Sequence, residues 1–289
     1  MTSLMSNIRT IHRTQPSFPT MDGAGVKLKR VFSHQETSLL DPFLLLDAFG
    51  SENPDDYIAG FPWHPHRGIE TVTYMLEGLV KHEDSIGNSG ILNGGDIQWM
   101  TAGRGIIHQE MPQVSEGKLA GFQLWVNLPK SHKLIDPRYQ DIQAAKVPEI
   151  QLDDGIKIRV LAGDYNDTKG PVKDIIAEPQ YLDVEIPSGQ TFKHTLKDGH
   201  TAFAYVFKGK GKFAPDSDKY FDMDNLVIYN RNGDRIQVTA SDDDKLRFLL
   251  ISGKPINEPI AWAGPIVMNT EEELRIAFEE YRNGTFLKK

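Results

Sequence analysis

The stretch Gly68-Ile69-Glu70-Thr71-Val72-Thr73-Tyr74-Met75-Leu76 indicates which secondary structure dominates this chain. It is rich in β-branched and aromatic residues, which favour strands. A second such stretch runs from Gly121 to Leu128, and others cover residues 156–161, 181–186, 202–207 and 246–251. Turn-forming pairs such as Glu77-Gly78 and Asn232-Gly233 lie between strand-like segments. Many short strands joined by turns predict an all-β protein, built as a barrel or a sandwich.

The length of 289 residues exceeds the roughly 100–200 residues usual for one domain, so we expect two. Residues 131–149 are polar and turn-prone, and a second series of strands opens near Ile150. We therefore predict an N-terminal domain over residues 1–145 and a C-terminal domain over residues 146–289. Their similar length and strand rhythm indicate a duplicated barrel.

One helix is predicted near the C-terminus. Thr270 and Glu273 have the spacing of a capping box, which begins a helix. Leu274, Phe278 and Tyr281 recur at helical spacing and form one apolar face, and Gly284 is the expected stop. We interpret this helix as structural.

Composition excludes several classes of function. The formal net charge of −8 argues against direct binding to nucleic acid or to an anionic membrane, because phosphate contacts need a basic surface. The absence of cysteine excludes disulfides and zinc-finger sites. No apolar run reaches the roughly 18 residues of a membrane span, and the N-terminus lacks the apolar stretch of a secretory signal. We expect a cytoplasmic protein, with a nuclear location open in a eukaryote.

Two short motifs carry metal-ligand chemistry. In His64-Pro65-His66 the two imidazoles are two residues apart, so on a strand they point to the same face. His108-Gln109-Glu110 repeats this spacing with an imidazole and a carboxylate. On neighbouring strands these motifs would offer three nitrogens and one oxygen to one ion. That ligand set suits Fe, Mn, Co, Ni, Cu or Zn and not Ca or Mg.

Glu70 is an alternative fourth ligand. It lies four residues beyond His66, so on one regular strand it would share the face of both histidines. It could bind the metal in place of Glu110 or orient a histidine ligand. His194 and His200 are six residues apart, out of register for one strand face, and we interpret them as surface or loop residues.

The motifs resemble those of a known family. His64-x-His66-x3-Glu70-x7-Gly78 with a later His108 is similar to the two motifs of the cupin superfamily. More narrowly, the segments 41–47, 61–72, 84–87, 98–112, 259–270 and 283–286 resemble the pirin family, from about residue 20 to the C-terminus. This resemblance implies two tandem cupin barrels, each a double-stranded β-helix, followed by the C-terminal helix. It implies Fe(II) in the N-terminal barrel, held by His64, His66, His108 and Glu110, and no metal in the C-terminal barrel.

The resemblance also implies an activity. It points to an Fe(II)-dependent dioxygenase similar to quercetin 2,3-dioxygenase, which opens a flavonol ring with dioxygen and releases carbon monoxide. Glu110 would accept the proton of the substrate hydroxyl. Candidate residues for the wall of a flat, apolar pocket are Phe43, Phe61, Trp63, Trp99 and Phe122.

Two other functions stay open. The first is an iron-binding regulatory module that docks onto a protein partner, as a transcriptional or metabolic co-regulator. The second is metal-dependent isomerisation or hydrolysis, because one fold supports many reactions. We expect a monomer, since two barrels can already cover each other's apolar faces.

Overall fold

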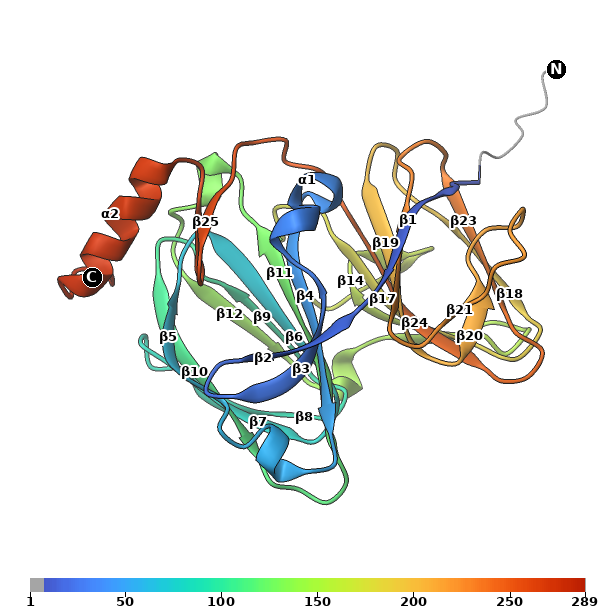
Figure 1. Cartoon of the computed structure of the whole chain (residues 1–289), viewed down its shortest axis with the longest axis horizontal. Helices are drawn as coiled ribbons and strands as arrows, with labels where there is room; N and C mark the ends of the chain where they lie inside the picture. Colours follow the sequence, from blue (N-terminus) through green and yellow to red (C-terminus); the bar gives the residue numbers. More distant parts are fainter. Residues whose placement is uncertain (1–7, 289) are drawn as a thin grey trace. The chain divides into compact units, whose positions relative to one another are not determined.

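The structure is a computed structural model that describes residues 8–288. Strands dominate it (Figure 1), and its two α-helices are α1 (Thr37–Leu40) and α2 (Glu271–Arg282). The predicted strands recur within one or two residues: residues 68–76 form most of β6 (Ile69–Glu77), and residues 246–251 lie in β24 (Leu246–Gly253). The all-β prediction is confirmed. Within residues 8–288, no helix combines the length and the apolar composition that crossing a membrane would need.

The chain forms two compact units. One, the N-terminal barrel unit, contains residues 18–146 and 256–288; the other, the C-terminal barrel unit, contains residues 8–17 and 147–255. The chain leaves the N-terminal barrel unit after Lys146 and enters the C-terminal barrel unit at Val147, one residue beyond the predicted boundary at residue 145. The predicted domains differ from these units at both ends of the chain. Residues 8–17 belong to the C-terminal barrel unit, and residues 256–288 belong to the N-terminal barrel unit. Thus β1 (Ile11–Pro16) extends the C-terminal barrel by pairing with β22 (Asn225–Tyr229).

The N-terminal barrel unit consists of two antiparallel sheets. Seven strands form the larger sheet in the order β12-β9-β6-β11-β4-β3-β2, and four form the smaller in the order β5-β10-β7-β8. The bounds not yet given are β2 Phe18–Asp22, β3 Val26–Phe32, β4 Phe43–Ser51, β5 Phe61–His66, β7 Leu79–Asp84, β8 Ser89–Asn93, β9 Ile97–Thr101, β10 Ile106–Gln113, β11 Leu119–Asn127 and β12 Arg138–Ile142.

The C-terminal barrel unit repeats this plan. Its sheets have the orders β1-β22-β19-β24-β17-β14-β13 and β18-β23-β20-β21, beside the small hairpin β15-β16. The remaining bounds are β13 Glu149–Gln151, β14 Lys157–Ala162, β15 Asp164–Tyr165, β16 Thr168–Lys169, β17 Gln180–Ile186, β18 Thr191–Thr195, β19 Thr201–Lys208, β20 Lys210–Lys212, β21 Phe221–Asp222 and β23 Arg235–Ala240. A seven-stranded and a four-stranded sheet in each unit agree with the predicted duplicated barrel.

The interiors of the two units differ. In the C-terminal barrel unit, inward side chains from both sheets form one continuous apolar cluster that includes Phe192, Phe213 and Phe248. In the N-terminal barrel unit, one apolar cluster lies around Met75 and Leu92 and another lies around Met100 and Ile106. Burial of each such side chain contributes about 1.5–3 kcal/mol. A cavity lined by residues of the N-terminal barrel unit lies beside the cluster of Met75 and Leu92.

The C-terminal segment packs onto the N-terminal barrel unit. It forms the hairpin of β25 (Ala261–Ala263) and β26 (Ile266–Met268) and then α2, which begins with the predicted capping box of Thr270 and Glu273. The helix buries Leu274 and Ala277, whereas the predicted face residue Tyr281 is 39% exposed. Buried Arg67, next to the β5 histidines, forms an ion pair with Glu280 at 2.7 Å. These contacts explain why the helix belongs to the N-terminal barrel unit and not to the second half of the chain.

Candidate metal centre

The two histidine motifs lie on neighbouring strands. β5 pairs with β10 in antiparallel register, which sets His64 opposite His108. Alternation along β5 turns His64 and His66 to one face, and along β10 it turns His108 and Glu110 inward. The three histidines offer ligand nitrogens that all lie within 4.8 Å of one another and could hold a metal ion. The fold therefore brings these three histidine side chains together, as the spacing of the two motifs predicts.

The hydrogen bonds determine which nitrogens face the centre. Nδ1 of His64 lies 2.9 Å from the carbonyl oxygen of Pro62, and Nδ1 of His66 lies 3.1 Å from that of Pro265. A carbonyl oxygen only accepts, so in each ring Nδ1 donates and Nε2 is the nitrogen left to bind a metal. These Nε2 atoms lie 3.1 Å apart, and Nε2 of His108 is buried with no hydrogen-bond partner among residues 8–288.

This arrangement fits a bound cation. Two lone pairs facing each other at 3.1 Å repel, and a metal ion shared between them removes the repulsion. Imidazole nitrogens bind transition metals at about 2.1 Å, so two nitrogens 3.1 Å apart could both reach one ion. The residues present therefore fit a transition-metal ion held by imidazole nitrogens.

Burial keeps two of the imidazoles in the form that binds metals. Desolvation lowers the pKa of His66 well below 6.5, and the neighbouring His64 lowers it further. Desolvation also lowers the pKa of His108 well below 6.5, with added repulsion from His66 and His64. Both rings therefore stay neutral near neutral pH, with no bound proton that a metal would have to displace.

Glu110 faces the same cavity as His64 and His66, and Glu70 does not. Glu110 Oε1 lies 3.1 Å from Thr73 Oγ1, and burial raises the pKa of the Glu110 carboxyl. Thr73 lines the cavity from β6, so Glu70, three residues earlier on that strand, points to the opposite face. There it accepts a hydrogen bond from Thr101 at 2.7 Å.

The expectation that Glu70 shares the face of the histidines is wrong, because the strand is not continuous. β5 ends at His66, and β6 begins at Ile69 in the other sheet. Gly68 makes the break with a φ of +77°, and a Cβ atom there would meet the carbonyl oxygen of Val267 at 1.9 Å. This geometry favours Glu110 over Glu70 as the carboxylate beside the histidines.

A cavity of about 520 Å³ opens beside the histidines, within the usual range for small-molecule sites. Aromatic residues line it, as predicted, but largely different ones. Phe61 is in the wall as expected, whereas Phe43, Trp99 and Phe122 are buried core residues and Trp63 is 50% exposed. The other aromatic lining residues are Phe49, Trp125 and Trp262.

Sequence reasoning missed the residues that contact the histidines from outside. Pro265 lies 199 positions beyond His66 and bonds to it through the β25–β26 hairpin. Tyr139 on β12 brings its hydroxyl to 3.5 Å from Nδ1 of His108. Neither has a local signal, because both contacts depend on pairing between distant segments.

From the sequence we interpret His194 and His200 as surface or loop residues. His200 does lie in the loop between β18 and β19, whereas His194 lies on β18, and the side chains of both are buried. His194 lies on β18, where its ring stacks on Tyr165 and Phe192 and its Nε2 lies 2.7 Å from Gln180 Oε1. Its neighbour on β23 is Ile236, whereas His64 on β5 has His108 as its neighbour on β10. His194 is thus packed in the barrel wall among aromatic rings.

Comparisons with known proteins give the family. The pirin family model matches residues 25–126, and the model of the pirin C-terminal cupin domain matches residues 181–287. A Pseudomonas aeruginosa protein named "Putative quercetin 2,3-dioxygenase" is 43% identical over 97% of this chain and 99% of its own. A pirin-like protein of Caulobacter vibrioides is 41% identical over 96% and 99%.

A solved structure shares the whole fold. The crystal structure of quercetin 2,3-dioxygenase from Acinetobacter baumannii superposes with a TM-score of 0.89 at 34% identity, covering 97% of this chain and 99% of that one. The two sheets of each unit, the two family models and this likeness agree on a pair of cupin barrels. The chain belongs to the pirin family of the cupin superfamily.

Proposed function

We propose that this pirin is an Fe(II)-dependent dioxygenase similar to quercetin 2,3-dioxygenase, which opens the ring of a flavonol with dioxygen. The observation that carries the proposal is the convergence of three imidazole Nε2 atoms beside a cavity of about 520 Å³ with aromatic walls. Relatives of closely similar length that bear the quercetin 2,3-dioxygenase name support it.

The residues that would hold the metal are His64, His66, His108 and Glu110. Bound iron would supply the one-electron chemistry that lets dioxygen react with an organic substrate. Imidazole and carboxylate ligands suit Fe(II) but do not exclude Mn, Co, Ni, Cu or Zn, so the identity of the metal is part of the proposal.

Glu110 is the proposed base. Thr73 Oγ1 lies near Oε1, while Oε2 receives no hydrogen bond within residues 8–288 and is the oxygen that would accept the proton of the substrate hydroxyl. Burial raises the pKa of Glu110, which strengthens it as a base near neutral pH. The rings of Phe61 and Trp125 would hold the flat substrate and exclude water from the reacting end.

The test combines metal analysis with a quercetin turnover assay, in which dioxygen is admitted to an anaerobic mixture. We expect about one iron per chain and measurable turnover for the wild type, and the loss of both for His66→Ala. His12→Ala is the control, because His12 is exposed and bonds only to Asn230 among the described residues. Full metal occupancy without turnover would refute the dioxygenase proposal and favour the regulatory module.

A further inference from the structure

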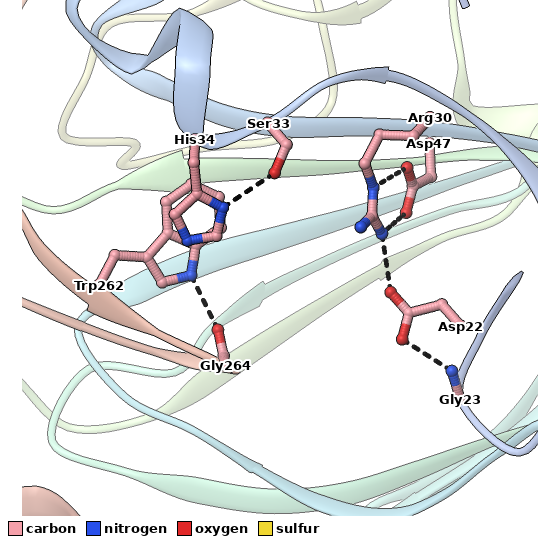
Figure 2. A network of polar contacts seen from close by, with 8 residues as sticks. All are labelled: Asp22, Gly23, Arg30, Ser33, His34, Asp47, Trp262 and Gly264. Carbon is pink, nitrogen blue, oxygen red and sulfur yellow. Dashed lines mark hydrogen bonds and ion pairs between the residues drawn. The ribbon is translucent and has the colours of Figure 1, made fainter. Parts of the chain in front are cut away.

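A group of three charged residues, one each on β2, β3 and β4, lines the cavity wall. Arg30 donates from Nε to Asp47 Oδ1 at 2.9 Å and from Nη2 to Asp47 Oδ2 at 2.8 Å, so the pair is bidentate. Nη2 also donates to Asp22 Oδ2 at 2.7 Å, and Asp22 Oδ1 accepts from the backbone N–H of Gly23. Figure 2 shows this chain of contacts. We call Arg30, Asp47 and Asp22 the polar subsite.

One donor group of Arg30 is left for a ligand. The guanidinium is planar, so the edge that binds Asp47 leaves Nη1 on the opposite side. No hydrogen bond from Nη1 exists within residues 8–288, although Arg30 itself lines the cavity. The carboxylate oxygens beside it have further lone pairs. The polar subsite thus presents a donor and acceptors side by side.

The charge of the polar subsite excludes one kind of ligand. Two carboxylates and one guanidinium give it a net charge of about −1 when all are ionised. An anionic group would be repelled, even though it could reach Nη1. A phenolic hydroxyl suits the subsite better, because it is uncharged and both donates and accepts.

A flat aromatic surface lines the same cavity. His34 stacks on Trp262 with ring centroids 3.6 Å apart and an interplanar angle of 13°. The indole N–H donates to the carbonyl oxygen of Gly264 at 2.8 Å, and Nδ1 of His34 lies 3.1 Å from Ser33 Oγ. These bonds hold both rings in place, so they offer planar packing and leave hydroxyl recognition to the polar subsite.

A purely structural role for the arginine pair can be tested within the same chain. Arg247 and Asp183 form an equally bidentate pair in the C-terminal barrel unit, at 2.9 and 2.6 Å. Asp183 is buried as Asp47 is, but neither residue of that pair lines the cavity. Arg30 differs in facing the cavity, where it also donates to Asp22. The Arg247–Asp183 pair is therefore a matched control.

We propose that Arg30, Asp47 and Asp22 are specificity-determining residues that bind an uncharged, hydroxyl-bearing aromatic ring of the substrate, with Nη1 of Arg30 donating to the hydroxyl oxygen. The inference rests on the proposed function in taking a flavonol as the ligand. It places in the polar subsite the end of the substrate that lies away from the reacting hydroxyl.

The experiment measures binding without turnover. Anaerobic calorimetry would give the Kd of quercetin and of 3-hydroxyflavone, which has the same skeleton and reacting hydroxyl but no other hydroxyl. We expect the wild type to bind quercetin at least about tenfold more tightly, as for one hydrogen bond to a charged group. Combining Arg30→Met with Asp47→Leu removes the pair without leaving a buried charge unpaired, and should abolish this preference.

Two further variants test whether the effect is specific to the polar subsite. Arg247→Met with Asp183→Leu should keep the wild-type preference. Asp22→Asn changes a half-exposed side chain, so this variant should fold normally. It should reduce the preference for quercetin about threefold. If the double variant is unfolded, the result for Asp22→Asn decides whether the inference holds.

An unchanged preference in the subsite variants would overturn the inference, as would the failure of the wild type to bind either flavonol. Normal binding preferences without oxygen consumption would support the polar subsite while refuting ring cleavage.

Discussion

Replacement of Tyr139 by Phe should weaken metal binding. The Tyr139 hydroxyl lies 3.5 Å from Nδ1 of His108, the nitrogen that faces away from the proposed metal. Burial raises the pKa of Tyr139, and the carboxylate of Asp84, to which it also hydrogen-bonds, raises it further. The hydroxyl therefore stays protonated, donates to Asp84 and can accept from His108. The variant removes this outer partner and leaves the ring in place.

The expected magnitude follows from the contact. Loss of an outer partner of a metal-bound histidine typically costs 10–100-fold in affinity. The distance of 3.5 Å is longer than the 2.9 Å contact that orients His64, so we expect the lower end, about tenfold or roughly 1.4 kcal/mol. Asp84 keeps the backbone N–H groups of Ile86 and Asn88 as partners, so the fold should be retained.

The assay is an anaerobic competition titration of Fe(II) against a chelator. Tyr165→Phe is the matched control, since Tyr165 also contacts a histidine, His194, but belongs to the C-terminal barrel unit. An affinity of Tyr139→Phe within twofold of the wild type would refute the argument that Tyr139 orients His108.

Two other predictions concern the fold around the centre. Gly68→Ala should lower the free energy of unfolding by more than about 2 kcal/mol, because its φ is +77° and the new Cβ would overlap the carbonyl oxygen of Val267. Gly87→Ala should lower the free energy of unfolding by only about 1 kcal/mol in urea titration, since Gly87 also has a positive φ but its added Cβ would meet open space. Equal losses of stability in the two variants would contradict the steric argument. Metal-free protein should lose stability as the pH falls below 6.5, because burial lowers the folded-state pKa values of His66 and His108 and the unfolded chain then binds more protons. Melting temperatures measured in a metal chelator from pH 6.5 downward test this prediction. His66→Gln should make the melting temperature depend less on pH.

Local patterns in the sequence were sufficient for much of the fold. Strand periodicity depends on neighbouring residues, so β6 and β11 could be predicted within two residues. The capping box of Thr270 and Glu273 is equally local, and it correctly begins α2. Spacing of two residues on a strand placed His64 and His66 on one face for the same reason.

The sequence by itself determined which side chains can be ligands and which strands carry them. Only the tertiary structure decided what surrounds those ligands: that Gly68 turns Glu70 away, that Pro265 and Tyr139 contact the histidines, and that α2 packs on the N-terminal barrel unit. The physical reason is that these contacts join residues up to 213 positions apart, as Arg67 and Glu280 are. Such pairs depend on strand register and chain path, which no short window of sequence contains.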